Sequence, residues 1–145
     1  MAVRKQYSIT GKVGDKALEL TFDGQHLHGR IGGALGKEVS LNLESGFIQG
    51  RVGGLIGGFT VNGQLGGGTV EARFGSDLMG ASLNLEVDAR GARGRLGGAI
   101  TGRAVDLQRV EGGFSGSIGA AAVQLETDVS ADLAALVAAV AEHVG

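Results

Sequence analysis

The tetrapeptide Gly50-Arg51-Val52-Gly53 is one of six copies of a short pattern, and these copies decide the fold. Each copy has a small anchor residue, a polar residue, a large apolar residue and a glycine, except that the fourth anchor is alanine. The other copies are Gly11-Lys12-Val13-Gly14, Gly29-Arg30-Ile31-Gly32, Ala72-Arg73-Phe74-Gly75, Gly94-Arg95-Leu96-Gly97 and Gly116-Ser117-Ile118-Gly119. Recurrence at a nearly constant spacing indicates an internal repeat, in which each unit forms one supersecondary element.

Apolar and small residues alternate with polar residues on both sides of each anchor. In the third unit, Ile48, Gly50, Val52 and Ile56 all have the same parity. A period of two predicts a strand, here about nine residues long. The strand is followed by Gly57-Gly58, and the equivalent pairs are Met79-Gly80 and Thr101-Gly102. These pairs predict two-residue hairpin turns.

The parity of the apolar positions reverses after each of these turns. Because a two-residue turn keeps its flanking pair on one face of a sheet, the reversal predicts antiparallel hairpins. Further turn pairs separate the units, at Ser45-Gly46, Gly67-Gly68 and Glu111-Gly112. We therefore predict that residues 6–129 form six hairpins, or twelve strands, in an up-and-down meander. The alternative is a parallel β-solenoid of six rungs with a helix cap, which does not explain the reversal.

Residues 130–144 change to a helical period. Ser130 can cap a helix, and Asp132 is favourable in its first turn. From Leu133 to Ala141 no side chain is polar, which indicates a helix buried on every side. Twelve strands closed into a barrel enclose more space than wall side chains fill. We predict a single domain, 1–145, that is all-β with one C-terminal helix inside the barrel. The inward glycines Gly33, Gly54 and Gly98 would make room for this helix.

This layout resembles that of the tubby and LURP-one-related proteins, in which a twelve-stranded barrel surrounds a hydrophobic C-terminal helix. The resemblance is one of layout, and it implies no functional residue in this chain.

Composition narrows the function classes. The 145-residue chain has 29 glycines, no cysteine and a net charge of -2. The lack of cysteine excludes a disulfide scaffold and thiolate metal sites, and fits a reducing compartment. The N-terminus has no apolar run typical of a signal peptide. We expect a soluble, cytoplasmic protein, and the charge predicts no binding to nucleic acid.

A row of basic residues follows the anchors on the outward face: Lys12, Arg30, Arg51, Arg73 and Arg95. Arg30, Arg51, Arg73 and Arg95 are candidates for an anion-binding or partner surface. A solvated polar ladder is the favoured interpretation, because the predicted register gives each arginine polar neighbours. Those neighbours are Glu19 and Asn42 for Arg30, Ser40 and Gln64 for Arg51, Asn62 and Glu86 for Arg73, and Asn84 and Gln108 for Arg95.

Three charges interrupt the inward apolar pattern: Lys37, Arg103 and Arg109. We expect them at the two barrel rims, where they would meet the ends of the helix, with Lys37 and Arg103 near Glu142 and the C-terminal carboxylate. A pocket is the alternative. His26 and His28 share one outer face, and we expect them to be surface residues because no third metal ligand is evident.

The predicted function is that of a non-catalytic structural or interaction module with a protein partner or self-association and no cofactor. Its turns are too short for an elaborate site. Ser115 lies in Gly-Phe-Ser-Gly-Ser, which lacks the closing glycine of a nucleophile elbow. The alternative is a carrier of a lipid or another apolar small molecule in the barrel lumen. A membrane barrel with its apolar face toward lipid is disfavoured by the lack of aromatic girdles.

Overall fold

A computed structural model describes residues 6–32, 36–53, 58–75, 80–97 and 102–144. These residues form twelve strands and one helix. The strands are β1 (Tyr7–Val13), β2 (Lys16–Phe22), β3 (His26–Ile31), β4 (Lys37–Glu44), β5 (Phe47–Val52), β6 (Phe59–Gly66), β7 (Thr69–Phe74), β8 (Ala81–Asp88), β9 (Gly91–Gly97), β10 (Gly102–Val110), β11 (Gly113–Ile118) and β12 (Ala121–Thr127). The helix is α1 (Ala131–His143).

The strands form a closed antiparallel barrel in sequence order. Each strand pairs with its neighbours along the chain, and β1 pairs with β12 to close the wall. The predicted twelve-stranded barrel is confirmed, and the parallel solenoid is wrong. The turns predicted between units are also confirmed, since Glu44 pairs with Phe47, Gly66 with Thr69 and Val110 with Gly113.

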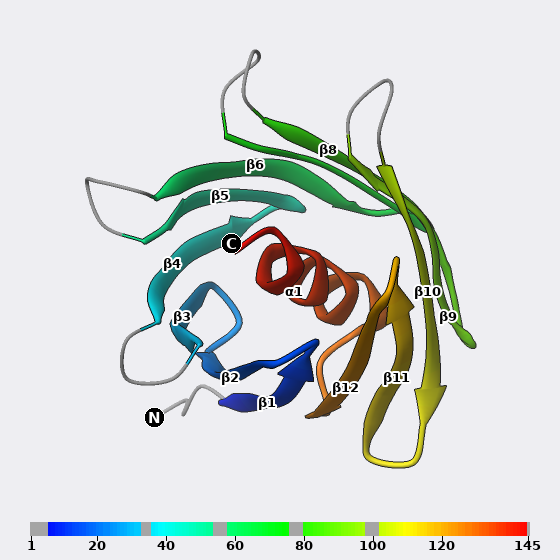
Figure 1. The fold of residues 1–145 in the computed structure, drawn as a ribbon. Helices are drawn as coiled ribbons and strands as arrows, with labels where there is room; N and C mark the ends of the chain where they lie inside the picture. The colour runs from blue at the N-terminus through cyan, green and yellow to red at the C-terminus, as the bar shows by residue number, and fades with distance from the viewer. Residues whose placement is uncertain (1–5, 33–35, 54–57, 76–79, 98–101, 145) are drawn as a thin grey trace.

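The helix α1 occupies the lumen, as predicted. Figure 1 shows it surrounded by the wall, from the blue strands through to the orange ones. Its residues from Leu133 to Ala141 are all buried, and Leu136 has no exposed surface. Ser130 is the N-cap residue, but its side chain makes no capping hydrogen bond. Its hydroxyl instead donates to the carboxylate of Asp132, which also accepts the Leu133 N–H at 2.7 Å.

Each anchor glycine lies directly opposite a leucine of the preceding strand in the wall. The glycine–leucine pairs are Gly11 with Leu125, Gly29 with Leu20, Gly50 with Leu41, Gly94 with Leu85 and Gly116 with Leu107. The fourth anchor, Ala72, lies opposite Gly63 instead, so the small residue has changed strands. A Cβ on Gly29 would lie 2.1 Å from the carbonyl oxygen of Glu19 and 2.8 Å from Cδ2 of Leu20. Backbone and leucine side chain therefore fill the place that a side chain at the anchor would need.

The second glycine of each copy ends its strand, which corrects the predicted register. Gly53 has a φ of +89°, which turns the chain away from the extended conformation directly after Val52. The strands are therefore shorter than the predicted nine residues in this unit, and β5 has six. In the four longer hairpins the last described pairs before the tip are Ile31 with Lys37, Val52 with Phe59, Phe74 with Ala81 and Gly97 with Gly102.

As a result, half of the predicted neighbours of the arginines are confirmed and half are wrong. Glu19, Ser40, Asn62 and Asn84 lie opposite Arg30, Arg51, Arg73 and Arg95 as predicted. Across the longer hairpins the partners are Glu38, Thr60, Ser82 and Ala104 instead of Asn42, Gln64, Glu86 and Gln108. Each observed partner is four residues from the predicted one. The inward and outward faces are unchanged, because four is an even number.

Some predictions fall outside the described residues. These are the positions of Gly33, Gly54 and Gly98 against the helix, the strand continuation to Ile56, and the first residues of the turns at Gly57, Met79 and Thr101.

Replacing an anchor glycine should lower the free energy of unfolding by more than backbone strain alone would. Gly29→Ala places a methyl group against the β2 backbone at a φ of +151°, so β3 must move away from β2. Gly66→Ala is the matched control, because Gly66 has a φ of +130° with nothing within 4 Å. For the control we expect the free energy of unfolding, measured in urea, to fall by about 1–3 kcal/mol. For Gly29→Ala we expect a distinctly larger loss. Equal losses would show that the close approach is unimportant.

A charge in the middle of the helix should prevent folding. Leu136→Asp buries an unpaired carboxylate, and we expect a loss of several kcal/mol or no folded protein, measured by circular dichroism and thermal unfolding. The control is Ser130→Asp, which adds the same charge at the exposed N-cap of the same helix, where aspartate is a good capping residue. A Leu136→Asp protein that melts like the parent would contradict burial of the helix.

Candidate functional surface

The arginines Arg30, Arg51, Arg73 and Arg95 lie on alternate strands of the outer wall and interact along it. Arg30 donates from Nη2 to Oε1 of Glu38 at 3.1 Å, and Arg73 donates from Nη1 to Oγ of Ser82 at 2.7 Å. The guanidinium of Arg95 lies over Gly102, where an added Cβ would be 2.6 Å from Nε. In these three cases the arginine reaches the following strand. This geometry supports the polar ladder more than a free anion surface.

Shallow grooves lined by both polar and apolar groups lie between the strands of the outer wall. One groove of about 560 Å³ is lined by Glu19, Thr21, His28 and Arg30 together with Glu38 and Ser40. A second of about 500 Å³ continues across β4 and β5 and includes His26, Asn42 and Gln49. A third, of about 480 Å³, lies over β7, β8 and β9 and includes Glu71, Glu86 and Arg93. Glycine anchors line all three, so the grooves follow the repeat.

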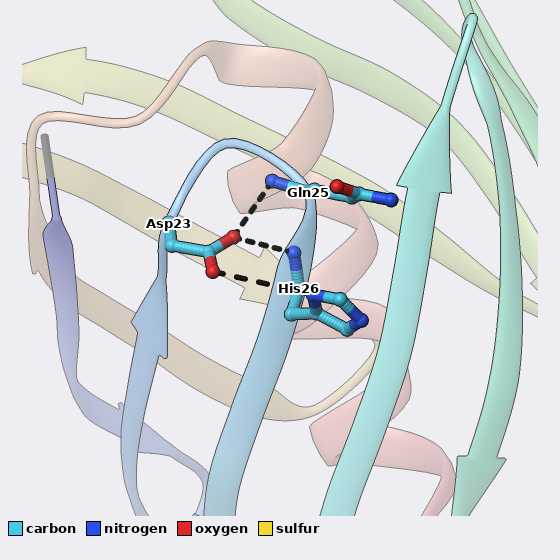
Figure 2. A network of polar contacts seen from close by, with 3 residues as sticks. All are labelled: Asp23, Gln25 and His26. Carbon is cyan, nitrogen blue, oxygen red and sulfur yellow. Dashed lines mark hydrogen bonds and ion pairs between the residues drawn. The ribbon is translucent and has the colours of Figure 1, made fainter. Parts of the chain in front are cut away.

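The turns between hairpins lie at one end of the barrel, which we call the connection rim. In Figure 2, the Asp23 carboxylate accepts the backbone N–H groups of Gln25 and His26, at 2.9 and 2.7 Å. The ring nitrogen Nδ1 of His26 is 4.0 Å from Asp23 Oδ2. Asp88 shapes the β8–β9 turn in the same way, and the N–H of Arg90 is the main cause that holds the pKa of Asp88 below its usual value. These carboxylates therefore shape turns.

The opposite end, the hairpin rim, receives the C-terminus of α1. The first inward residue of each returning strand lies here, and these six residues form what we call the rim ring: Lys16, Lys37, Phe59, Ala81, Arg103 and Ala121. Each pairs with the large apolar residue of its repeat copy. Every copy of the repeat therefore keeps a large apolar residue at this position, whereas the residue opposite it is charged, aromatic or small.

Three members of the rim ring contact the helix end. Lys16 donates from Nζ to the carbonyl oxygens of Val144 and Glu142, the latter at 3.2 Å. Arg103 Nε lies 3.5 Å from Glu142 Oε1. Phe59 packs edge-on against the imidazole of His143, with ring centroids 4.7 Å apart. Cations near the last carbonyls complement the negative end of the helix dipole.

The expected rim contacts are confirmed for one residue of three. Arg103 meets Glu142 as predicted. Lys37 lies at the same rim, but its expected partner at Gly145 is outside the described residues. Arg109 is at the connection rim, where its guanidinium lies 4.8 Å from the centre of the Phe114 ring; within the described part of the chain it makes no ion pair with the helix. The adjacent strand offers Arg109 an aromatic face, and its expected contact with the start of the helix stays a prediction.

Sequence reasoning missed Lys16 and His143. Lys16 has the inward parity of Leu18 and Leu20, so the rule that selected Lys37 and Arg103 would have found it. His143 is half-buried between Phe59 and Phe74, with ring centroids 5.5 Å apart for the second pair. Burial is the main cause that lowers the pKa of His143, and Arg103 and Lys16 lower it further. No sequence signal indicated which aromatic residues would surround it.

The described side chains do not assemble a recognisable catalytic or metal centre. Ser115 lies opposite Gln108 and Gln124, and an amide cannot act as its base. His28 lies opposite Thr21 and Ser40. Among the residues that the structure describes, no three histidine or carboxylate side chains gather as metal ligands. The polar wall and the rim ring are therefore the candidate functional surfaces.

Comparison with protein-family models, curated proteins and solved structures finds no match for this chain. The resemblance to tubby and LURP-one-related proteins thus stays one of layout. Within the described ranges, the helix is too short to cross a membrane.

The Arg30–Glu38 pair tests whether the ladder is a weak surface feature. Both side chains are exposed, and we expect a coupling energy below about 1 kcal/mol in a double-mutant cycle of Arg30→Gln and Glu38→Gln, measured by urea unfolding. The coupling should weaken further in 0.5 M salt. A coupling well above 1 kcal/mol that resists salt would contradict this interpretation.

Proposed function

We propose that the protein is a non-catalytic structural or interaction module that acts through its outer wall and rims. The observation that carries this proposal is the position of α1, whose buried residues fill the lumen where a barrel of this size would otherwise hold a ligand. The hollows of about 560, 500 and 480 Å³ lie outside the lumen and have linings that combine polar side chains with apolar surface. A protein partner or a second copy of the chain is the occupant that fits such shallow grooves.

One atom in the second groove supports contact with a partner. The Oδ1 atom of Asn42 is buried and has no hydrogen-bond partner among the described residues. A buried acceptor of this kind is costly unless a donor reaches it. A partner donor, or a bound water molecule, would satisfy it.

The alternative function is that of a carrier of a lipid or another apolar small molecule. The observation that favours it is the wall lining, which includes Phe74, Phe114, Ile9 and Leu83 as fully buried side chains. If α1 left the lumen, these side chains would line a deep apolar cavity. We place this second because it requires the buried face of the helix to be exposed.

Native mass spectrometry after detergent-free purification distinguishes the two functions. The module predicts the mass of the polypeptide or a whole multiple of it, with no bound apolar molecule. A carrier predicts an additional mass that organic extraction recovers as lipid. Recovery of lipid at one molecule per chain would overturn the proposed module. The sequence favours a cytoplasmic location for such a module. The expected partner surface is the groove around Asn42. Asn42→Leu should therefore weaken any self-association that the spectra show.

A further inference from the structure

The end of α1 is held by a small cluster whose members come from different hairpins. Lys16 of β2 bonds to the last carbonyls, Arg103 of β10 pairs with Glu142, and Phe59 of β6 and Phe74 of β7 contact the ring of His143. Three of these four wall residues belong to the rim ring. The hairpins supply lysine, arginine, phenylalanine or alanine at the equivalent position, and three of the six residues contact the helix terminus.

His143 is the one titratable aromatic group in this cluster. Its imidazole is half-buried between two phenylalanine rings, and the charged groups that face it are cations: Lys16 from β2 and Arg103 from β10. Glu142, its neighbour on α1, is engaged by Arg103. Lys37 from β4 is a further cation of the rim ring, but it is not one of the groups that lower the pKa of His143. A proton on this imidazole would therefore add positive charge to a site that already holds positive charge and offers little water.

We propose that His143 and the rim ring form an acid-responsive latch, in which protonation of the imidazole at mildly acidic pH releases the last turn of α1 from the barrel rim. The proposal is independent of the partner on the outer wall. It concerns the C-terminal end of the helix in the lumen.

The direction of the pH effect follows from linkage. Burial, Arg103 and Lys16 lower the pKa of His143 in the closed state, whereas a released imidazole has an ordinary pKa of about 6.5. Protons therefore bind the released state more strongly. The stabilisation of the closed state is complete above about pH 6.5. As the pH drops from there toward the lowered pKa, the equilibrium constant between the closed and released states shifts toward release by up to tenfold per pH unit.

Hydrogen exchange measured by NMR on the full chain tests the latch. The readout is the exchange rate of the Val144 amide, which donates to the Val140 carbonyl, relative to amides of residues 134–137 in the same sample. This ratio is corrected for the intrinsic rates of each amide. From pH 7.5 to 5.5 we expect the ratio to rise by up to about tenfold, above the range in which carboxyl groups ordinarily titrate.

Two histidine variants isolate the group responsible. His143→Phe keeps an aromatic ring against Phe59 and Phe74 but cannot take a proton, and its ratio should stay constant over this range. His28→Gln removes an exposed histidine of the outer wall and should respond like the parent. A constant ratio in the parent, or an equal rise in His143→Phe, would overturn the latch.

Two lysine variants test the part played by the cations. Lys16→Met should raise the ratio at both pH values and reduce its pH dependence, because one cause of the lowered pKa is removed. Lys37→Met changes the same ring at a residue that makes no hydrogen bond or ion pair with the described part of the helix, and should leave the ratio near the parent's. A parent-like pH dependence in Lys16→Met would show that the cations do not set the response.

Discussion

The approach of each anchor residue to the neighbouring strand is the contact on which the barrel depends. At five of six anchors a glycine faces a leucine, and at the sixth Ala72 faces Gly63. Each pair of an anchor and the residue opposite it on the preceding strand therefore contains one large side chain or two small residues, and never two large side chains. Because Gly11 of β1 and Leu125 of β12 continue the same rule, the seam that closes the barrel is made like the rest of the wall. Closure leaves no edge strand and commits the inward apolar side chains to one enclosed space.

The enclosed space explains the composition of the helix. A helix with a polar stripe would bury unpaired polar groups, so only the ends of α1 carry them. Its alanines let the backbone lie close to the leucines, valines and phenylalanines of the wall. Outside, the same alternation leaves polar side chains on every strand, and these interact with one another across the strands. Function is therefore left to the outer wall and to the rims.

The sequence predicted which face each residue takes more accurately than which residue lies opposite it. Parity depends on alternation alone, and the inward positions of Ile48, Val52 and Val61 follow from it. Register also depends on where the hairpin turns. The predicted strand continued through Gly53 toward Ile56, whereas the positive φ of Gly53 ends the strand there. Both interpretations keep the same parity, so the apolar pattern could not distinguish them. The cluster around His143 was harder to predict from the sequence, because the neighbours of His143 come from strands far apart in the chain.

The rim ring shows how a repeat can carry a specific site. Inside the wall, a charge would cost far more than any single contact returns, so every copy must keep its apolar residue. At the rim, all of these side chains except Ala81 are at least partly exposed, and the equivalent positions are free to differ. They hold two lysines, an arginine, a phenylalanine and two alanines around one helix end. The helix breaks the symmetry of the barrel, because a single asymmetric terminus meets six equivalent hairpins. Three of these variable residues, Lys16, Phe59 and Arg103, contact this terminus, while the residues that recur hold the wall together.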